Sequence, residues 1–328
     1  MKSAIPLDTV LGLLYGERAR NDTGLRKQLA RVLGKDVVDT LGDVRAITMA
    51  LDRQTWPTPL VVRFMADDIT FARINGLDCP VDRHDLAVST PAAGQGRWEP
   101  HLVACFERLC RAGQTAYDIG ANVGYHTLLL AKLVGPEGQC IAFEPNSENC
   151  RLVHVGCVRN GLDNVRLVPL ALSDEPGWAY FSSHIGSNGG IVSEQYVGLH
   201  GHGTVVPVAR LDDLSLPLPD FIKIDVEGAE YRALRGAERA IRDGRPAIIS
   251  EFSLEMTPRV SGVSGEAYLE WIASLGYSIW LIDQSGRRPQ PVSSIRAFLD
   301  GWGRLDRIED LLFLPTEKAP LLADVASR

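Results

Sequence analysis

The sequence lacks the features that mark several large classes of protein. No stretch approaches the about 18 apolar residues needed to span a bilayer, and the first twenty residues show no long apolar core followed by a small-residue cleavage site. An excess of basic residues is also missing, since 34 Lys and Arg stand against 41 Asp and Glu, for a formal net charge of -7. We therefore expect a cytoplasmic protein that neither spans a membrane nor binds nucleic acid.

Paired cysteines are missing as well. The six cysteines, at positions 79, 105, 110, 140, 150 and 157, form no CxxC pair and no cluster with histidine at zinc-binding spacing. We expect reduced, mostly buried thiols, because nothing around them signals the electropositive, accessible setting of a reactive cysteine. With 45% hydrophobic and 23% charged residues, the composition is that of a folded globular protein.

From about residue 100 onward the chain alternates short β-rich runs with helical patterns. This alternation is typical of βαβ units and predicts a parallel sheet covered by helices on both faces. We expect an α/β fold of Rossmann-like type, with a doubly wound sheet of seven strands whose last two pair like a hairpin. The strands are expected at residues 114–119, 140–143, 165–172, 220–225, 246–252, 277–282 and 310–314. The helices are expected at residues 125–134, 145–159, 229–242 and 265–274.

Two segments depart from this pattern. Between about residues 177 and 208 the expected helix is replaced by alternating stretches around the loop HIGSNGG, which predicts a hairpin near the site. Within residues 1–98, amphipathic helical patterns lead into a β-like stretch at 60–74 and then into a predicted loop at 83–96. We divide the chain into this mostly helical extension with a small β segment and a second domain over 99–328. The extension is expected to act as a lid, to bind substrate or to pair two subunits into a homodimer.

A glycine-rich turn, DIGANVG, follows the first predicted strand. Glycine lets the backbone turn tightly and lets a ligand approach, and the helix N-terminus that follows favours an anion. The spacing differs from the GxGxxG of dinucleotide-binding folds, which argues against a dehydrogenase. Asp118 at the strand end would repel a pyrophosphate but suits an ammonium group, so the turn favours a ligand with an amino acid moiety, such as S-adenosylmethionine.

Acids follow two further predicted strands. Glu144 stands 26 positions after Asp118, close to the offset at which Rossmann-type folds place the acid that binds ribose hydroxyls. The alternative is an acid that only stabilises a helix N-terminus. The run DVEGAE at 225–230 lies beside the point where open α/β sheets bind ligands, although helix capping and solvation would also explain its acids. Lys223 shares a strand face with Asp225 and is expected to pair with an acid and lower its pKa.

Together these motifs resemble the FkbM family of S-adenosylmethionine-dependent methyltransferases, a class I family. The matching motifs follow in the expected order over about residues 97–255, and they are RWEP, TAYDIGANVGYHTLLLA, IAFEPN, an NG pair, SD, SNGG, LDDL and IKIDVEGAE. Residues 1–80 carry no such resemblance. The resemblance implies an enzyme that uses S-adenosylmethionine and methylates mainly hydroxyl groups, often on sugars, glycans or polyketide-type natural products.

The resemblance also implies which residues bind the cofactor. The residues expected to surround S-adenosylmethionine are Glu99, Asp118, Gly120, Asn122, Gly124, Glu144, Ser173, Asp174 and Asp225. Within this set Glu144 would hold the ribose, and Ser173 and Asp174 would lie near the adenine ring. Glu99 would reach the cofactor from the N-terminal side.

Methyl transfer to a hydroxyl group is an in-line displacement in which proximity supplies much of the acceleration and a base assists the attacking oxygen. His126 is a candidate for this base, with a purely structural role as the alternative. The resemblance implies that Asp225 and Glu227 lie near the transferred methyl group, and Asp225 and Lys223 are expected to be catalytic. The residues expected to contact the acceptor are Asn188, Glu227 and Glu251. Asp225 and Glu251 would be placed to share a divalent cation, although the sequence has no dedicated metal motif.

Because the motifs describe the donor and not the acceptor, other functions stay open. One is methylation of a nitrogen or a carboxyl group in a small molecule or peptide. Another is a non-catalytic protein that uses the fold as a ligand sensor or scaffold. That function would require the loss of donor-binding residues, and none of the matched ones is missing.

Overall fold

The computed structural model describes residues 69–82, 85, 87–185, 188–192, 203–284 and 288–319, which all belong to the unit Asp68–Arg328. The helical patterns predicted before residue 60 lie outside the described residues. So does the first part of the predicted β-like stretch, up to residue 68.

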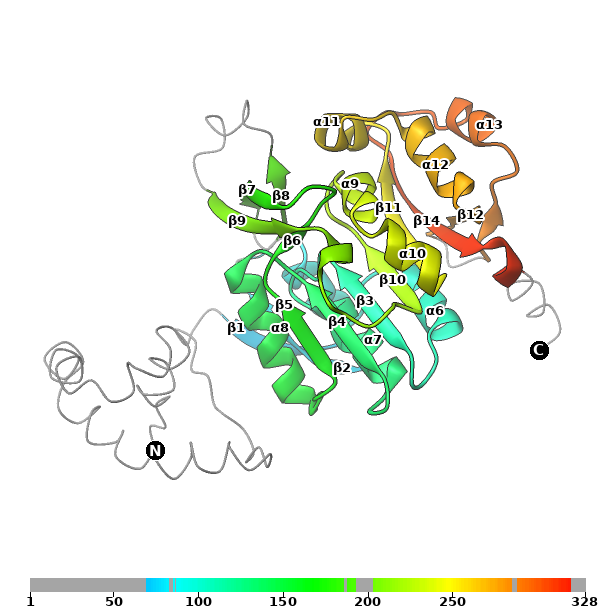
Figure 1. Ribbon diagram of the computed structural model, residues 1–328. Coiled ribbons are helices and arrows are strands. Elements are labelled where there is room, and N and C mark those ends of the chain that lie inside the picture. The colour runs from blue at the N-terminus through cyan, green and yellow to red at the C-terminus, as the bar shows by residue number, and fades with distance from the viewer. Residues whose placement is uncertain are drawn as a thin grey trace, which may run out of the picture. The chain divides into compact units, whose positions relative to one another are not determined.

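An eight-stranded sheet forms the centre of this unit (Figure 1). Its strands are β3 (Thr115–Ile119), β4 (Gln139–Phe143), β5 (Val165–Val168), β10 (Phe221–Ile224), β11 (Ala247–Ser253), β12 (Tyr277–Ile282), β13 (Gln290–Pro291) and β14 (Ile308–Pro315). Their order across the sheet is β13-β12-β14-β11-β10-β3-β4-β5. The strands from β5 to β11 are parallel, and β14 runs antiparallel between β11 and β12. The predicted doubly wound sheet of seven strands is confirmed, with the short β13 added at one edge.

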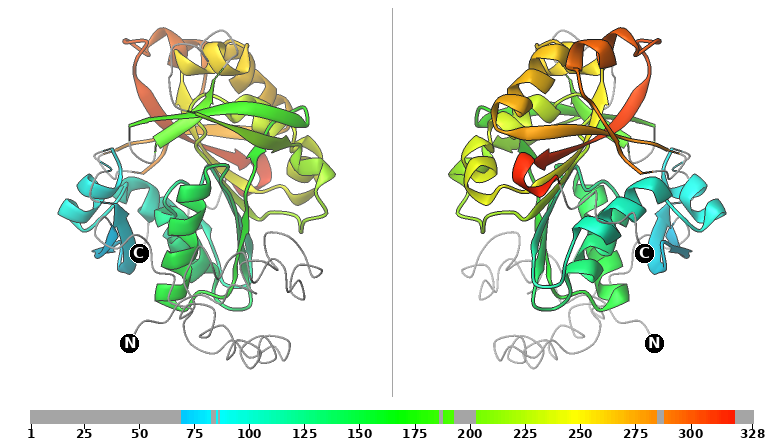
Figure 2. Two further views of the ribbon diagram at one scale, coloured as in Figure 1. Left: turned by 90° about the vertical axis from the view of Figure 1, so that its left-hand side faces the viewer. Right: turned by 90° about the vertical axis from the view of Figure 1, so that its right-hand side faces the viewer.

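Helices cover both faces of this sheet. The described α-helices are α5 (Ser89–Gln95), α6 (Pro100–Leu109), α7 (Tyr125–Val134), α8 (Ser147–Asn160), α9 (Glu230–Arg235), α10 (Glu238–Gly244), α11 (Met256–Ser261), α12 (Gly265–Ser274) and α13 (Ile295–Asp300). Alternate residues of a strand face opposite sides, so Cys140 and Ala142 of β4 join one apolar core and Ile141 and Phe143 join the other. Helices α6, α7 and α8 close the first core, and α9, α10 and α12 close the second on the opposite side (Figure 2).

The single helix predicted at 229–242 is wrong, because the chain forms α9 and α10 with a break between them. A Cβ at Gly236 would lie 2.0 Å from the carbonyl oxygen of Ser173, so only glycine fits there. Asp212 then starts the second helix, since its carboxylate accepts from the backbone N–H groups of Arg239 (2.8 Å) and Ala240 (3.0 Å). This cap comes from a residue distant in sequence and leaves no periodic signal.

A second sheet replaces the missing helix after β5. Its strands are β6 (Ala171–Leu172), β7 (Gly177–Ile185), β8 (Asn188–Val192) and β9 (Thr204–Ala209), in the order β6-β9-β7-β8. The predicted hairpin is present as the antiparallel pair β7 and β8, and β9 pairs with the other side of β7. The strand predicted at 165–172 is wrong as one strand. It divides at Pro169, which has no N–H to continue the ladder, so that β5 and β6 belong to different sheets.

Before the central sheet, β1 (Ile69–Ile74) and β2 (Leu77–Asp82) form an antiparallel hairpin. The turn residues Asn75 and Gly76 both have positive φ, of 50° and 75°, as a two-residue hairpin turn of the primed type requires. Side chains from both strands enter the same apolar core as α7 and α8. The described residues of this hairpin therefore pack with the helices of the central sheet, and the boundary at residue 98 stays a prediction.

The loop predicted at 83–96 is wrong, because Ser89–Gln95 form α5. The carboxylate of Asp85 accepts from the backbone N–H groups of Ala87, Val88 and Ser89, at 2.9 to 3.2 Å, and so satisfies donors at the start of the helix. Pro91 falls in the first turn, where proline is tolerated. Gly96, with φ 67°, ends the helix in the left-handed conformation.

Two further predictions concern the whole described part of the chain. All six cysteines are free thiols, and five of them are buried, as predicted. Among the helices that the structure describes, none is both long and apolar enough to cross a membrane.

Candidate active site

Two adjoining clefts open at the carboxyl ends of β3, β4, β10 and β11. Cleft A lies over β3 and β4, and its apolar wall contains Phe143, Leu170, Leu172, Phe181 and Ile191. Cleft B lies toward α5 and α7, and its wall contains Ala87, Val88, Trp98, Glu99, Tyr125, His126, Lys223 and Glu251. Both clefts are lined by Gly120, Asn122, Asp225 and Glu227. The two clefts thus meet at the glycine-rich turn and the acidic run after β10.

The turn after β3 needs glycine at position 120 for a steric reason. Gly120 has φ 82°, and a Cβ there would lie 1.9 Å from the carbonyl oxygen of Asp225. The turn after β3 and the chain after β10 therefore lie backbone against backbone. Gly124, with φ 91°, lies against Val153 of α8 and lines neither cleft among the described residues, so its role is helix packing.

Glu144 joins this turn to the start of α8. Its Oε2 accepts from the backbone N–H of Asn122 (2.7 Å), and its Oε1 accepts from the backbone N–H of Asn146 (2.8 Å). Burial raises the pKa of Glu144 to about 7, against the lowering effect of these hydrogen bonds. Because the residue also lines cleft A, its carboxylate is placed to accept from a ligand hydroxyl.

Asp118 and Lys223 lie beneath the turn. Asp118 is completely buried, accepts from Thr127 Oγ1 (2.5 Å) and lines neither cleft among the described residues, so its contact with the cofactor stays a prediction. Lys223 Nζ lies 3.8 Å from Asp118 Oδ1 and 3.3 Å from Asp225 Oδ2. Burial lowers the pKa of Lys223, but the Asp225 and Asp118 carboxylates outweigh it and raise the pKa. Lys223 is therefore a fixed ammonium group rather than a base.

Glu99 and His126 form a pair in cleft B. His126 Nε2 donates to Glu99 Oε2 at 2.6 Å, and the imidazole ring packs edge-on against Phe106. Burial would raise the pKa of Glu99, but the hydrogen bond and charge of His126, together with Lys223, lower it to about 2. Nε2 is engaged with Glu99, whereas Nδ1 is buried and has no hydrogen-bond partner among the described residues, so the role of His126 as the base stays a prediction.

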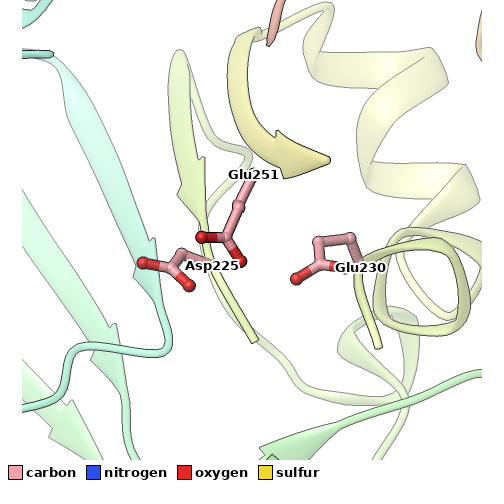
Figure 3. A group of neighbouring side chains, drawn as sticks. All are labelled: Asp225, Glu230 and Glu251. Carbon is pink, nitrogen blue, oxygen red and sulfur yellow. The ribbon is translucent and has the colours of Figure 1, made fainter. Parts of the chain in front are cut away.

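Three carboxylates gather beside this pair. Oxygens of Asp225, Glu230 and Glu251 all lie within 4.8 Å of one another, with Glu251 between the other two (Figure 3). Glu230 Oε1 accepts from the backbone N–H groups of Val226 (2.9 Å) and Gly228 (3.1 Å), and burial raises its pKa to about 7. Oxygen ligands of this kind suit Mg²⁺ or Mn²⁺, so these residues could hold such an ion.

Two other predicted cofactor residues lie apart from the clefts. Ser173 Oγ donates to Asp174 Oδ1 (3.0 Å), which also accepts from Arg232 Nε (2.7 Å). Neither lines cleft A or cleft B in the described structure, whereas Leu170, Ala171 and Leu172 line cleft A. The turn at Pro169 shifts the chain, so the residues before Ser173 reach the cleft instead.

The SNGG segment contributes to cleft A rather than to cleft B. Gly189 and Gly190 of β8 line cleft A, and a Cβ at Gly190 would lie 3.1 Å from Cβ of Glu227. The side chain of Asn188 lies outside what the structure describes, so its predicted contact with the acceptor stays a prediction. Phe181 and Ile191, which also line cleft A, were missed because β-strand alternation alone does not show which face meets a ligand.

The strand order and the position of the clefts agree with the predicted class I fold of S-adenosylmethionine-dependent methyltransferases. Residues 118–279, just under half of the chain, match the family model described as a methyltransferase FkbM domain. The resemblance drawn from the motifs is thus confirmed.

Individual relatives are more distant. A protein-L-isoaspartate O-methyltransferase from Methanopyrus kandleri is 33% identical over 101 residues, which are 29% of this chain and 44% of that protein. The crystal structure of methyltransferase FkbM from Methylobacillus flagellatus has a TM-score of 0.39 and 16% identity, over 64% of this chain and 50% of that one. A S-adenosylmethionine-dependent O-methyltransferase from Thermotoga maritima has a TM-score of 0.36 and 14% identity, over 65% and 62% of the two chains. The chain thus spans less than two thirds of each of these relatives.

Proposed function

We propose that the chain is a S-adenosylmethionine-dependent methyltransferase that methylates a hydroxyl group on a sugar, glycan or other natural product. One observation carries this proposal: clefts A and B meet at Gly120, Asn122, Asp225 and Glu227. A donor in cleft A would present its methyl group to an acceptor in cleft B, and holding two reactants in this way supplies much of the rate of an in-line displacement.

The residues of cleft A fit an adenosyl group. Phe143, Leu172, Phe181 and Ile191 provide apolar surface for an adenine ring. The buried carboxylate of Glu144 provides an acceptor for ribose hydroxyls. When bound, S-adenosylmethionine supplies a methyl group on a positively charged sulfur, which is a good leaving group.

The charged side chains that line cleft B affect which chemical class of acceptor can bind there. Glu99, Asp225, Glu227 and Glu251 line it, and Lys223 is its one lysine or arginine among the described residues. A carboxylate acceptor, such as the isoaspartyl group named for the Methanopyrus kandleri relative, would be repelled by these acids. A neutral hydroxyl group would not be repelled.

The same acidic side chains favour a second candidate function, which is methyl transfer to an amine. A protonated amine would be attracted by the four carboxylates of cleft B. It would still have to lose a proton before its nitrogen could attack the methyl carbon. The amine and the hydroxyl acceptor differ in their products, so one experiment separates them.

That experiment incubates purified protein with methyl-labelled S-adenosylmethionine and a small-molecule extract from a strain that lacks the protein. A hydroxyl acceptor gives a labelled ether that withstands alkali, whereas a methyl ester is hydrolysed and a methylamine is identified by mass spectrometry. An alkali-labile product would contradict the assignment of the acceptor. Absence of any labelled product, together with no thermal stabilisation by S-adenosylhomocysteine, would contradict the assignment as a methyltransferase.

A further inference from the structure

The two ring nitrogens of His126 lie in different surroundings. Nε2 is 2.6 Å from Glu99 Oε2, whereas Nδ1 is buried and has no hydrogen-bond partner among the described residues. The side chain is only 5% exposed, yet it forms part of the wall of cleft B. A buried polar atom without a partner costs free energy that a bound donor recovers. Nδ1 therefore indicates a place where a hydroxyl group of a ligand would donate.

The charge of Glu99 decides which nitrogen of His126 carries the hydrogen. Burial would raise the pKa of Glu99, but the hydrogen bond and charge of His126, together with Lys223, lower it to about 2. The carboxylate is therefore ionised at neutral pH and can only accept, so the nitrogen that contacts it, Nε2, carries the hydrogen. In a neutral imidazole the other nitrogen then keeps its lone pair. Nδ1 is thus a proton acceptor, and Glu99 orients the ring.

The surrounding structure holds both members of this pair in place. Glu99 has φ 43°, a left-handed conformation that is costly for a residue other than glycine and needs support from its neighbours. Asn75, in the turn between β1 and β2, supplies part of this support. Its side chain donates to the carbonyl oxygen of Trp98 and accepts from the backbone N–H of Trp98, both at 3.1 Å. The ring of His126 in turn packs edge-on against Phe106 of α6.

The other titratable side chains of cleft B are placed differently. They are Glu99, Tyr125, Lys223, Asp225, Glu227 and Glu251. The hydroxyl of Tyr125 donates to the carbonyl oxygen of Pro80 (3.0 Å), and Lys223 donates to Asp225. Glu251 lies with Asp225 and Glu230 in the group of carboxylates that could hold a cation. His126 differs from these side chains, because a carboxylate holds one of its nitrogens and leaves the other as a buried acceptor.

His126 also lies close to the junction of the two clefts. It is the second residue of α7, and it follows the turn in which Gly120 and Asn122 line both clefts. An acceptor in cleft B is therefore placed to contact His126 while its hydroxyl oxygen faces a donor in cleft A.

We propose that His126 Nδ1 accepts the proton of the acceptor hydroxyl group and that Glu99 is its positioning residue, an inference that rests on the proposed function. As the acceptor oxygen forms its bond to the methyl carbon, the carbon–sulfur bond breaks and its electron pair stays on sulfur, giving neutral S-adenosylhomocysteine. The hydroxyl proton passes to Nδ1, and the ionised Glu99 stabilises the imidazolium that forms. The imidazolium then loses a proton to solvent, which restores the pair without a further reactant.

The test separates proton transfer from a purely structural role. His126→Gln keeps a side-chain N–H that can donate to Glu99 but has no basic nitrogen, and Glu99→Gln keeps an acceptor for Nε2 but removes the charge. The control is His154→Gln, because His154 is exposed on α8 and lines neither cleft in the described structure. Turnover is measured with methyl-labelled S-adenosylmethionine and the small-molecule extract over a range of pH, and S-adenosylhomocysteine affinity is measured by calorimetry.

We expect His126→Gln to lower turnover about a hundredfold or more and to leave S-adenosylhomocysteine affinity almost unchanged. It should also abolish the rise of turnover with pH on the acidic limb, since a base acts only in its unprotonated form. Glu99→Gln should lower turnover by a smaller factor and move the acidic limb to lower pH, because the imidazolium loses its ionised partner. Added imidazole should restore part of the turnover of His126→Ala, and His154→Gln should behave like the parent.

Several results would overturn this role. An acidic limb that persists in His126→Gln would remove His126 from proton transfer, and loss of the limb in Glu227→Gln or Glu251→Gln instead would move the role to that carboxylate. Nuclear magnetic resonance of the isotope-labelled imidazole would also contradict it by showing a hydrogen on Nδ1 and none on Nε2 at neutral pH. A parent that forms no labelled product refutes the proposed function itself, whereas the other outcomes leave that function standing.

Discussion

Glu144 gives a prediction that does not depend on knowing the acceptor. With a pKa of about 7 in the free protein, about nine-tenths of the molecules carry a protonated Glu144 at pH 6. Ribose hydroxyls that donate to this group favour its ionised form. Binding of S-adenosylhomocysteine at pH 6 should therefore release up to about one proton for each molecule bound.

The linkage also fixes how affinity changes with pH. Below pH 7 the affinity for S-adenosylhomocysteine should rise by up to about tenfold for each pH unit, and above pH 7 it should level off. Glu144→Gln cannot release this proton, and it loses a charged acceptor worth about 1.5 to 3 kcal/mol. Its affinity should be about tenfold to a hundredfold lower at pH 8.

Isothermal titration calorimetry at pH 6, in two buffers that differ in their enthalpy of ionisation, measures the proton release directly. Glu137→Gln is a suitable control, because Glu137 is exposed in the turn between α7 and β4 and lines neither cleft in the described structure. Equal binding heats in both buffers, with an affinity that does not change between pH 6 and 8, would refute ribose binding by Glu144. Proton release that persists in Glu144→Gln would assign the linkage to Glu230 or Glu251.

Three further changes test other parts of the structure. Gly120→Ala should lower the free energy of unfolding by more than about 2 kcal/mol in urea denaturation, and it should abolish S-adenosylhomocysteine binding. The control is Gly113→Ala, because Gly113 has the same φ of 82° but open space around it. This control should lose less unfolding free energy and bind S-adenosylhomocysteine normally. Glu230→Gln keeps an oxygen for the two backbone donors and removes a group whose pKa is raised to about 7 by burial, from an ordinary value of about 4.3. The variant should therefore gain up to about 3 kcal/mol of stability at pH 8 and nothing below pH 4, and an equal gain at both pH values would contradict this. Deletion of residues 1–60 should leave S-adenosylhomocysteine binding intact, because the residues described in both clefts lie after residue 85. The deletion should lower acceptor turnover or dissociate a dimer in sedimentation experiments. A truncated protein with unchanged association state and turnover would show that this segment is dispensable.

The central sheet could be predicted because its strands are buried on both faces. Runs such as residues 221–224 contain buried side chains throughout, and such short runs separated by helical patterns indicate a parallel sheet. The helix predictions were wrong where a single side chain decides where a helix starts. Asp85 and Asp212 supply the caps of α5 and α10, and neither contact leaves a periodic pattern in the sequence.

The candidate site was predictable where its residues follow strand ends. Glu144 and Asp225 come directly after β4 and β10, and parallel strands bring their carboxyl ends to one edge. Asp310 and His101 could not be predicted, because β14 and α6 reach the site through strand register and helix packing between distant parts of the chain. Asp118, Ser173 and Asp174 line neither cleft in the described structure, so their contacts with the cofactor stay predictions.

The place of β14 has a consequence for how the protein is made. This strand lies between β11 and β12, although it follows both of them in the sequence. While the ribosome is still adding residues before Ile308, β11 has an open edge, and Glu251 has no neighbouring strand to hold Asp310 beside it. The residues of both clefts are therefore synthesised well before the strand that completes their sheet, and an exposed edge of this kind is a site where nascent chains pair wrongly. Chains released by stalled synthesis just before residue 308 should aggregate, whereas chains released after Pro315 should fold.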